Sequence, residues 1–283
     1  MIIGFLGKGG SGKSTLSSGF VTYLAKKDIK VLAIDADHNM DLTFNLGVEE
    51  KFPYLGEGIK DIKEHAGLSI QDESGKAFFL EKEPHFSLTP ADPYTKKFSL
   101  RINDNVSVMA GGPHTDAVLY GQSCSHILTT ALKIYLPFLK LNKNEVVVID
   151  EKAGSDGAGT GIVSGFTMAI IATEPTPHGV KAANQIADLL EFHNTPYEFA
   201  INKIRKNTDL APTQASLKKP AKFMFPFSED ALQTNGNPTP DFEKQFNEIY
   251  QTAVKIIETN GDMRKERSRK KYERSRAFKE HAH

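Results

Sequence analysis

A glycine- and lysine-rich run that directly follows a short apolar segment constrains the fold of this chain more than any other feature. The apolar segment spans residues 2–6, and the run GKGGSGKST occupies residues 7–15. Gly12 and the pair Lys13-Ser14 complete the spacing G-x4-G-K-[ST], the P-loop motif. In such a loop glycine N–H groups surround phosphates, the lysine neutralises the β and γ oxygens, and the hydroxyl binds Mg²⁺. The motif predicts a strand, a triphosphate site and a helix, in that order.

The same glycines also fit the dinucleotide-binding spacing G-x-G-x-x-G, with acidic residues about 20 positions later. A dinucleotide site needs no lysine and hydroxyl directly after its last glycine, whereas a triphosphate site does. Lys13 and Ser14 therefore favour ATP with Mg²⁺ bound by Ser14. The residues that we expect to contact the nucleotide here are Gly9, Gly10, Ser11, Gly12, Lys13, Ser14 and Thr15.

Short continuous apolar runs, typical of strands buried on both faces of a parallel sheet, recur along the chain. They span residues 2–6, 31–34, 146–149, 169–172, 199–201 and 223–225, with a weaker candidate at 106–109. Helical patterns separate them, and two of these open with a Thr-Pro pair, Thr176-Pro177 and Thr239-Pro240. We predict an α/β fold with a doubly wound, mostly parallel sheet and helices on both faces. Loops and short helices are expected over 47–105.

The charge of the chain is unevenly distributed, although 35 Lys and Arg residues balance 35 Asp and Glu residues. Residues 264–283 carry nine basic and three glutamate residues, so this segment has a net charge of about +6. We predict a single ATPase domain over 1–262 and a basic tail over 263–283 that is either a helical extension or disordered and is solvated. No apolar run approaches 18 residues, so we expect no membrane span and a cytoplasmic protein.

The single cysteine excludes an intrachain disulfide and any four-cysteine zinc or iron–sulfur site within one chain. An electron-transferring reductase whose shared cluster needs two cysteines per chain is excluded on the same ground.

Lys8 adds a second lysine to the phosphate loop, and the segment KGGSGKST resembles the deviant P-loop of the MinD/ParA-like superfamily. That superfamily includes septum-positioning and chromosome-partition ATPases and metallocentre-maturation ATPases. In its members the extra lysine reaches across a face-to-face dimer to the partner's phosphates. The resemblance implies a P-loop ATPase that forms a homodimer when ATP is bound, with Lys8 and Lys13 taking part in catalysis.

Acidic residues follow two of the expected strands. The segment from Asp35 to Leu42 resembles switch I of the superfamily, which implies that Asp37 positions the attacking water and holds Mg²⁺ through water, and that Asp41 senses Mg²⁺ or phosphate. Asp150 ends an apolar strand in the Walker-B pattern and would hold Mg²⁺ through water. A carboxylate at the carboxyl end of a parallel strand faces the ligand crevice. Turn or capping roles remain open for Asp35 and Asp37.

Four further residues match the superfamily pattern. Gly154, after Ala153, occupies the switch II position, where its N–H would sense the γ-phosphate. Asn202 follows the expected strand 199–201 and resembles the asparagine that reads adenine. Pro226 and Phe227 follow the next strand, where relatives line the adenine pocket.

Several segments resemble one branch of the superfamily, the carbon monoxide dehydrogenase nickel-insertion accessory ATPases. They are Asp35–Leu42, Phe86–Pro90, Val106–Gly112, Gly121–Ser125, Ala153-Gly154 and Thr173–Pro175. The chain departs from that branch at two places: Gln122 stands where the first cysteine of a Cys-x-Cys pair is expected, and Lys152 replaces an acid.

Cys124 has His126 two residues away, near the expected start of a helix that would lower the thiol pKa. Across a two-fold axis these residues would supply two sulfurs and two nitrogens to Zn²⁺, or two thiolates and solvent to Zn²⁺ or Ni²⁺. The alternative is a small buried hydrophobe beside a surface histidine.

The resemblance favours an ATPase that couples hydrolysis to maturation of a client metalloenzyme by metal insertion or client activation. The alternative is a positioning ATPase acting on DNA or a membrane surface, for which the basic tail is the motivating feature. The tail offers only Tyr272, Ala277 and Phe278 as an apolar face, too little for stable membrane insertion. We therefore expect no nucleic-acid partner and a solvated tail.

Overall fold

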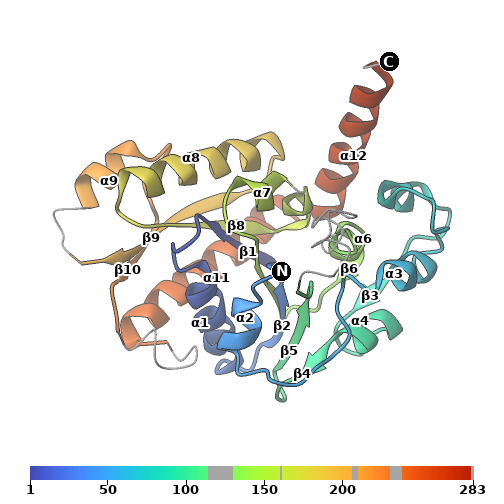
Figure 1. The fold of residues 1–283 in the computed structure, drawn as a ribbon, viewed down its shortest axis with the longest axis horizontal. Coiled ribbons are helices and arrows are strands. Elements are labelled where there is room, and N and C mark those ends of the chain that lie inside the picture. Colours follow the sequence, from blue (N-terminus) through green and yellow to red (C-terminus); the bar gives the residue numbers. More distant parts are fainter. Residues whose placement is uncertain (114–129, 160, 206–209, 230–237, 282–283) are drawn as a thin grey trace.

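The computed structural model describes residues 1–113, 130–159, 161–205, 210–229 and 238–281. Within them, a central sheet has the strand order β10-β9-β8-β1-β7-β2-β5-β4, and β3 pairs with β6 in a second, two-stranded sheet (Figure 1). The strands are β1 Ile2–Gly7, β2 Lys30–Asp35, β3 Phe86–Ser87, β4 Leu100–Arg101, β5 Val106–Ala110, β6 Leu139–Lys140, β7 Glu145–Asp150, β8 Met168–Thr173, β9 Tyr197–Ile204 and β10 Phe223–Pro226. Only β4 pairs antiparallel in this central sheet.

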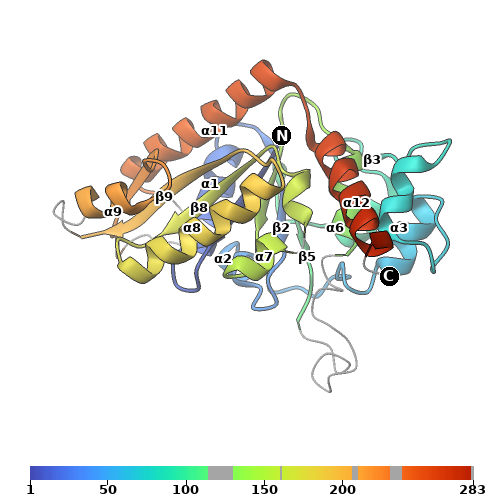
Figure 2. The same ribbon diagram turned by 90° about the horizontal axis from the view of Figure 1, so that it is seen from above.

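Helices cover both faces of the sheet, with α1 and α11 on one side and α8 on the other (Figure 2). The α-helices are α1 Lys13–Ala25, α2 Asp41–Asn45, α3 Ile59–His65, α4 Pro93–Phe98, α6 Leu132–Phe138, α7 Ser155–Gly159, α8 Pro177–Phe192, α9 Leu210–Ser216, α11 Pro240–Asn260 and α12 Arg264–His281, and the 3₁₀ helices are η1 Ser74–Phe79 and η3 Ile162–Gly165. The predicted doubly wound α/β architecture is confirmed.

Every strand predicted from a continuous apolar run is present, including the weaker candidate, which is β5. All six residues of β1, β7 and β8 are buried. Because helices pack on both faces of these strands, side chains of either orientation must be apolar, and this is why continuous runs identified them. The expected short helices of the 47–105 segment are α3, η1 and α4.

The two Thr-Pro pairs open α8 and α11, but their threonines behave differently. The Thr176 hydroxyl accepts a hydrogen bond from the Gly179 N–H at 3.1 Å, which caps α8. Thr239 stands at the same position of α11 without a side-chain capping bond. That helix ends at Gly261, whose φ of 68° lies in the left-handed region that glycine tolerates.

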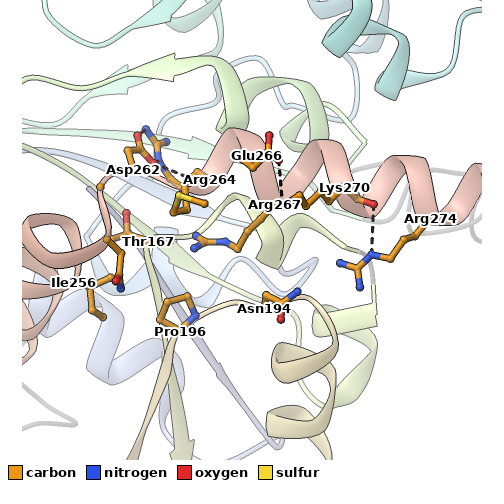
Figure 3. Close-up of a pocket in the computed structure, with 13 residues that line it drawn as sticks. Thr167, Asn194, Pro196, Ile256, Asp262, Arg264, Glu266, Arg267, Lys270 and Arg274 are labelled. Atoms are coloured by element: carbon orange, nitrogen blue, oxygen red, sulfur yellow. Dashed lines mark hydrogen bonds and ion pairs between the residues drawn. The ribbon is translucent and has the colours of Figure 1, made fainter.

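The basic tail forms α12, and the expectation that it is solvated is wrong for its first turns. Arg264 is only 5% exposed, and its guanidinium donates to the Leu136 and Leu139 carbonyls and pairs with Asp262. Figure 3 shows Arg264 beside Asp262, with Arg267 directed toward Thr167 one turn further along the helix. Because α12 packs on the rest of the protein through charged and small polar side chains, its sequence has no apolar pattern that would predict the contact.

None of the described helices combines the length and the apolar character needed to cross a bilayer.

Candidate nucleotide site

The phosphate loop lies between the end of β1 at Gly7 and the start of α1 at Lys13. Gly10 and Gly12 have φ values of 84° and 86°, so the loop needs glycine at both places to make its turns. The Ser11 N–H closes the loop by donating to the Lys8 carbonyl at 3.0 Å. Lys13 is buried, whereas Lys8 is exposed at the tip. The predicted strand–loop–helix order is present, and its backbone can approach an anion closely.

Two residues near the carboxyl end of β9 hold this loop from the side. The Asn202 amide donates to the Ser11 carbonyl at 2.9 Å, and the Lys203 ammonium contacts the Gly10 carbonyl and pairs with Glu174 at 2.8 Å. Asn202 therefore braces the phosphate loop in this structure, and its adenine-reading role stays a prediction. The Lys203–Glu174 pair was missed, although its opposite charges at the ends of neighbouring strands β9 and β8 were a usable signal.

Lys13 is the centre of a buried charge cluster. Its ammonium lies 3.2 Å from Asp37 Oδ2 and 3.9 Å from Asp150 Oδ2, and the three side chains are at most 7% exposed. Burial disfavours the charged lysine, but the attraction of Asp150 and Asp37 outweighs it and raises the pKa of Lys13. The structure thus brings together three residues that the sequence assigned to catalysis and Mg²⁺ binding.

Asp150 ends β7 and is fully buried. Burial raises its pKa to about 7, against the opposing effect of Lys13, and the Asp35 charge adds to the rise. The nearby Ser14 hydroxyl also lowers the pKa of Asp150. Among the described residues, however, no donor makes a hydrogen bond of normal geometry to either carboxylate oxygen of Asp150. A buried carboxylate left without hydrogen bonds costs free energy unless a cation satisfies it.

The donor set suits Mg²⁺. Ser14 supplies a hydroxyl oxygen, Asp150 an unsatisfied carboxylate and Asp37 a second carboxylate, and Mg²⁺ in phosphate sites takes oxygen ligands from one or two carboxylates plus phosphates. Across the described residues, no group of three or more His, Cys, Asp or Glu side chains is arranged to hold a metal ion by itself. The residues therefore fit a metal that is bound together with a nucleotide.

Asp35 has the capping role that the sequence left open. Its carboxylate accepts bonds from the Thr43 N–H at 2.8 Å and the Thr43 hydroxyl at 3.0 Å, which ties α2 to the end of β2. Asp37 combines a turn bond from the Asn39 N–H with its ion pair to Lys13. Asp41 is exposed at the start of α2 and makes no ion pair with the cluster; its charge adds only a minor part of the rise in the Lys13 pKa.

Gly154 lies against the phosphate loop, where its N–H donates to the Gly7 carbonyl at 2.9 Å. A γ-phosphate would have to replace this carbonyl as the acceptor, which makes the bond a candidate switch. Glu151, which sequence reasoning missed, is fully buried beside this segment. Burial raises its pKa well above the usual range, and its Oε2 has no hydrogen-bond partner among the described residues.

Pro226 and Phe227 lie at the far edge of the sheet, where β10 pairs with β9. The Phe227 N–H donates to the Ile204 carbonyl at 2.9 Å, and the Arg205 guanidinium stacks 3.5 Å from the Phe227 ring centroid. Pro226 is exposed. Both residues lie one strand beyond Asn202, so an adenine contact there stays a prediction. Gln122, Cys124 and His126 lie outside the described residues, as does the expected metal site on a dimer axis.

A family model, the CobQ/CobB/MinD/ParA nucleotide binding domain, matches residues 2–268. An ATP-binding protein of Methanocaldococcus jannaschii is 29% identical over 212 residues, which is 74% of this chain and 80% of that protein. The carbon monoxide dehydrogenase accessory protein CooC of Rhodospirillum rubrum is 27% identical over 191 residues, 67% of this chain and 68% of that protein. The septum site-determining protein MinD of Pyrococcus horikoshii, solved with Mg-ADP, has a TM-score of 0.60 at 19% identity and covers 90% of this chain and 98% of its own.

Proposed function

The chain belongs to the CobQ/CobB/MinD/ParA nucleotide-binding domain family, and we propose that it is a Mg²⁺-dependent ATPase that works as an ATP-induced homodimer. The observation that carries this proposal is the placement of Lys13 between the buried carboxylates of Asp37 and Asp150 at the mouth of the phosphate loop. A lysine for phosphate oxygens, a carboxylate for a water molecule and a carboxylate for a metal are the groups that phosphoryl transfer to water requires.

Each residue has a distinct part in the proposed reaction. Lys13 exchanges its ion pair with Asp37 for the phosphate oxygens, which frees the Asp37 carboxylate to orient a water molecule in line with the γ-phosphate. Ser14 and Asp150 would hold Mg²⁺, which would supply positive charge to the phosphates. The Gly154 N–H leaves the Gly7 carbonyl for the γ-phosphate, which couples the switch II segment to the nucleotide.

The exposure of Lys8 supports a role toward a partner protomer. It is exposed at the tip of the phosphate loop and makes no ion pair with the described residues. In a face-to-face dimer an exposed lysine at this tip would contribute positive charge to the partner's phosphates, where charge develops during the reaction. Lys8 is therefore proposed to be catalytic in trans.

Hydrolysis is tested by measuring phosphate release and molar mass in solution for the wild type and two variants. Asp37→Ala should bind ATP and accumulate as a dimer with little phosphate release, because it removes the water-orienting carboxylate and leaves Lys13 in place. Lys8→Ala should release phosphate at least about tenfold more slowly. The matched control is Lys82→Ala, which removes an exposed lysine far from the loop in sequence. Wild-type protein that releases no phosphate with Mg-ATP would refute the proposal.

We further propose that the ATPase cycle serves the maturation of a client metalloenzyme. The support is the similarity to CooC, which covers about two thirds of both chains. The second candidate is a positioning ATPase that acts on DNA or a membrane surface, favoured by the basic surface of α12.

The two candidates differ in what the ATP-locked dimer binds. Crosslinked Asp37→Ala with ATP should recover a metalloenzyme subunit from the source cells, and the same variant with ADP should not. Sedimentation with plasmid DNA and with anionic vesicles forms the second arm. ATP-dependent binding to DNA or vesicles, without recovery of a metalloenzyme, would overturn the maturation role and leave the ATPase intact.

A further inference from the structure

A cavity of about 410 Å³ lies where α12 meets the body of the protein, away from the phosphate loop. Its walls come from η1, α6, the turn at Gly161 and one side of α12. Figures 1 and 2 show α12 beside α6, in agreement with the packing between these helices. A cavity of this volume is in the range of small-molecule sites.

The carboxylates at the rim of this cavity are already engaged. Asp72 pairs with Lys76 at 2.9 Å and accepts the Ser69 N–H at 2.8 Å. Glu73 pairs with Lys279 at 2.9 Å and accepts the Tyr272 hydroxyl at 3.0 Å. The acidic side of the lining is therefore neutralised by partners of its own.

Two lysines in the wall have no such partner. Lys133 from α6 and Lys271 from α12 are half-buried, and neither forms an ion pair with a carboxylate among the described residues. Burial lowers the pKa of both ammonium groups, and Lys133 lowers that of Lys271 further. Two cations that are partly stripped of water and repel each other destabilise the empty site.

Lys271 packs closely against the turn at Gly161. Its ammonium passes over Gly161, where the Cβ atom of any other residue would lie 2.7 Å from Nζ, so the turn leaves room for the lysine only because Gly161 lacks a side chain. The hydroxyls of Ser74 and Ser275 also line the cavity and add hydrogen-bond donors. The wall thus combines positive charge with neutral hydrogen-bond donors.

We propose that this cavity binds a small anionic ligand, a carboxylate or a phosphate, between Lys133 and Lys271. The anion would supply the negatively charged partner that both ammonium groups lack and would form charge-assisted hydrogen bonds with them in place of water. Gly161 and Ile162 follow the switch II segment closely in the chain, so the site lies next to the part of the protein that the nucleotide is proposed to move.

Calorimetric titration tests this site on the full-length protein with the nucleotide site filled by Mg-ADP. Inorganic phosphate and succinate are the two probes, and they distinguish a phosphate ligand from a carboxylate ligand. Wild-type protein should bind at least one of them, and Lys133→Gln or Lys271→Gln should weaken that binding by about tenfold or more. Lys60→Gln, an exposed lysine outside the lining that pairs with none of the lining carboxylates, is the matched control and should bind as the wild type does.

Melting temperatures separate a binding role from a structural one. Without a probe, both cavity variants should melt at the same temperature as the wild type or higher, because each removes an uncompensated cation. The probe should raise the melting temperature of the wild type only. Failure of both probes to bind would overturn the proposal, and so would binding that neither substitution weakens.

Discussion

Replacing Gly12 by alanine should destabilise the protein more than the same change at Gly10, although both glycines have nearly the same backbone conformation. Their φ values are 86° and 84°. A Cβ on Gly10 would have no atom within 4 Å, whereas a Cβ on Gly12 would lie 2.3 Å from the Asn202 amide nitrogen. The pair therefore separates the cost of the backbone conformation from the cost of displacing Asn202.

The expected magnitudes follow from these two terms. Alanine in the left-handed region destabilises the folded state by about 1–2 kcal/mol. Alanine also reduces the conformational entropy of the unfolded chain, which offsets about 0.4–1 kcal/mol, so Gly10→Ala should lower the free energy of unfolding by about 1 kcal/mol. Gly12→Ala adds the displacement of Asn202, whose amide donates to the Ser11 carbonyl. Leaving that carbonyl unsatisfied costs about 1–3 kcal/mol more.

Urea unfolding of both variants measures these costs, and nucleotide titration reports the loop itself. The double variant Gly12→Ala/Asn202→Ala should be less destabilised than the sum of its two single changes. Each single change already loses the Asn202–Ser11 hydrogen bond, and without the Asn202 side chain the new Cβ atom has no amide to displace. Equal destabilisation by Gly10→Ala and Gly12→Ala, or strict additivity with Asn202→Ala, would refute the account of how Asn202 braces the loop.

Two further predictions concern stability. Burial, with smaller effects of Lys271 and Arg274 in the same direction, lowers the pKa of His193 to about 4. As the pH falls, His193 binds a proton near pH 6.5 in the unfolded chain but only near pH 4 in the folded chain. The free energy of unfolding should therefore fall by up to about 3 kcal/mol between about pH 6.5 and pH 4. His193→Gln should flatten this part of the pH profile of urea unfolding, and the exposed His178→Gln should not. Thr176→Ala should cost about 1 kcal/mol because it removes a capping bond, whereas Thr239→Ala should cost a few tenths; equal costs in thermal unfolding would contradict the capping assignment.

The fold was predictable because its determinants are local. Strands buried on both faces need continuous apolar runs, and the P-loop spacing has one structural context, strand then helix. The convergence of Asp37 and Asp150 on Lys13 was also predictable, because carboxyl ends of neighbouring parallel strands meet at one edge.

The contacts that sequence reasoning missed or misplaced depend on three-dimensional packing. Asn202 matched a motif, yet its amide braces the Ser11 carbonyl, a partner 191 residues away in the chain. Glu151 adjoins a motif residue, but its complete burial follows from the packing around it. The docking of α12 rests on Arg264, whose guanidinium satisfies buried carbonyls, and such an anchor has the same sequence signal as a solvated basic residue.

The proposal that each active site combines residues of two protomers is tested most directly by mixing two variants whose phosphate release is impaired. Lys8→Ala keeps Asp37, and Asp37→Ala keeps Lys8, so a mixed dimer should contain one complete site. A one-to-one mixture should recover phosphate release to about a quarter of the wild-type rate, since half of the dimers are mixed and each has one of two sites intact. A mixture that is no more active than its two components measured separately would contradict the claim.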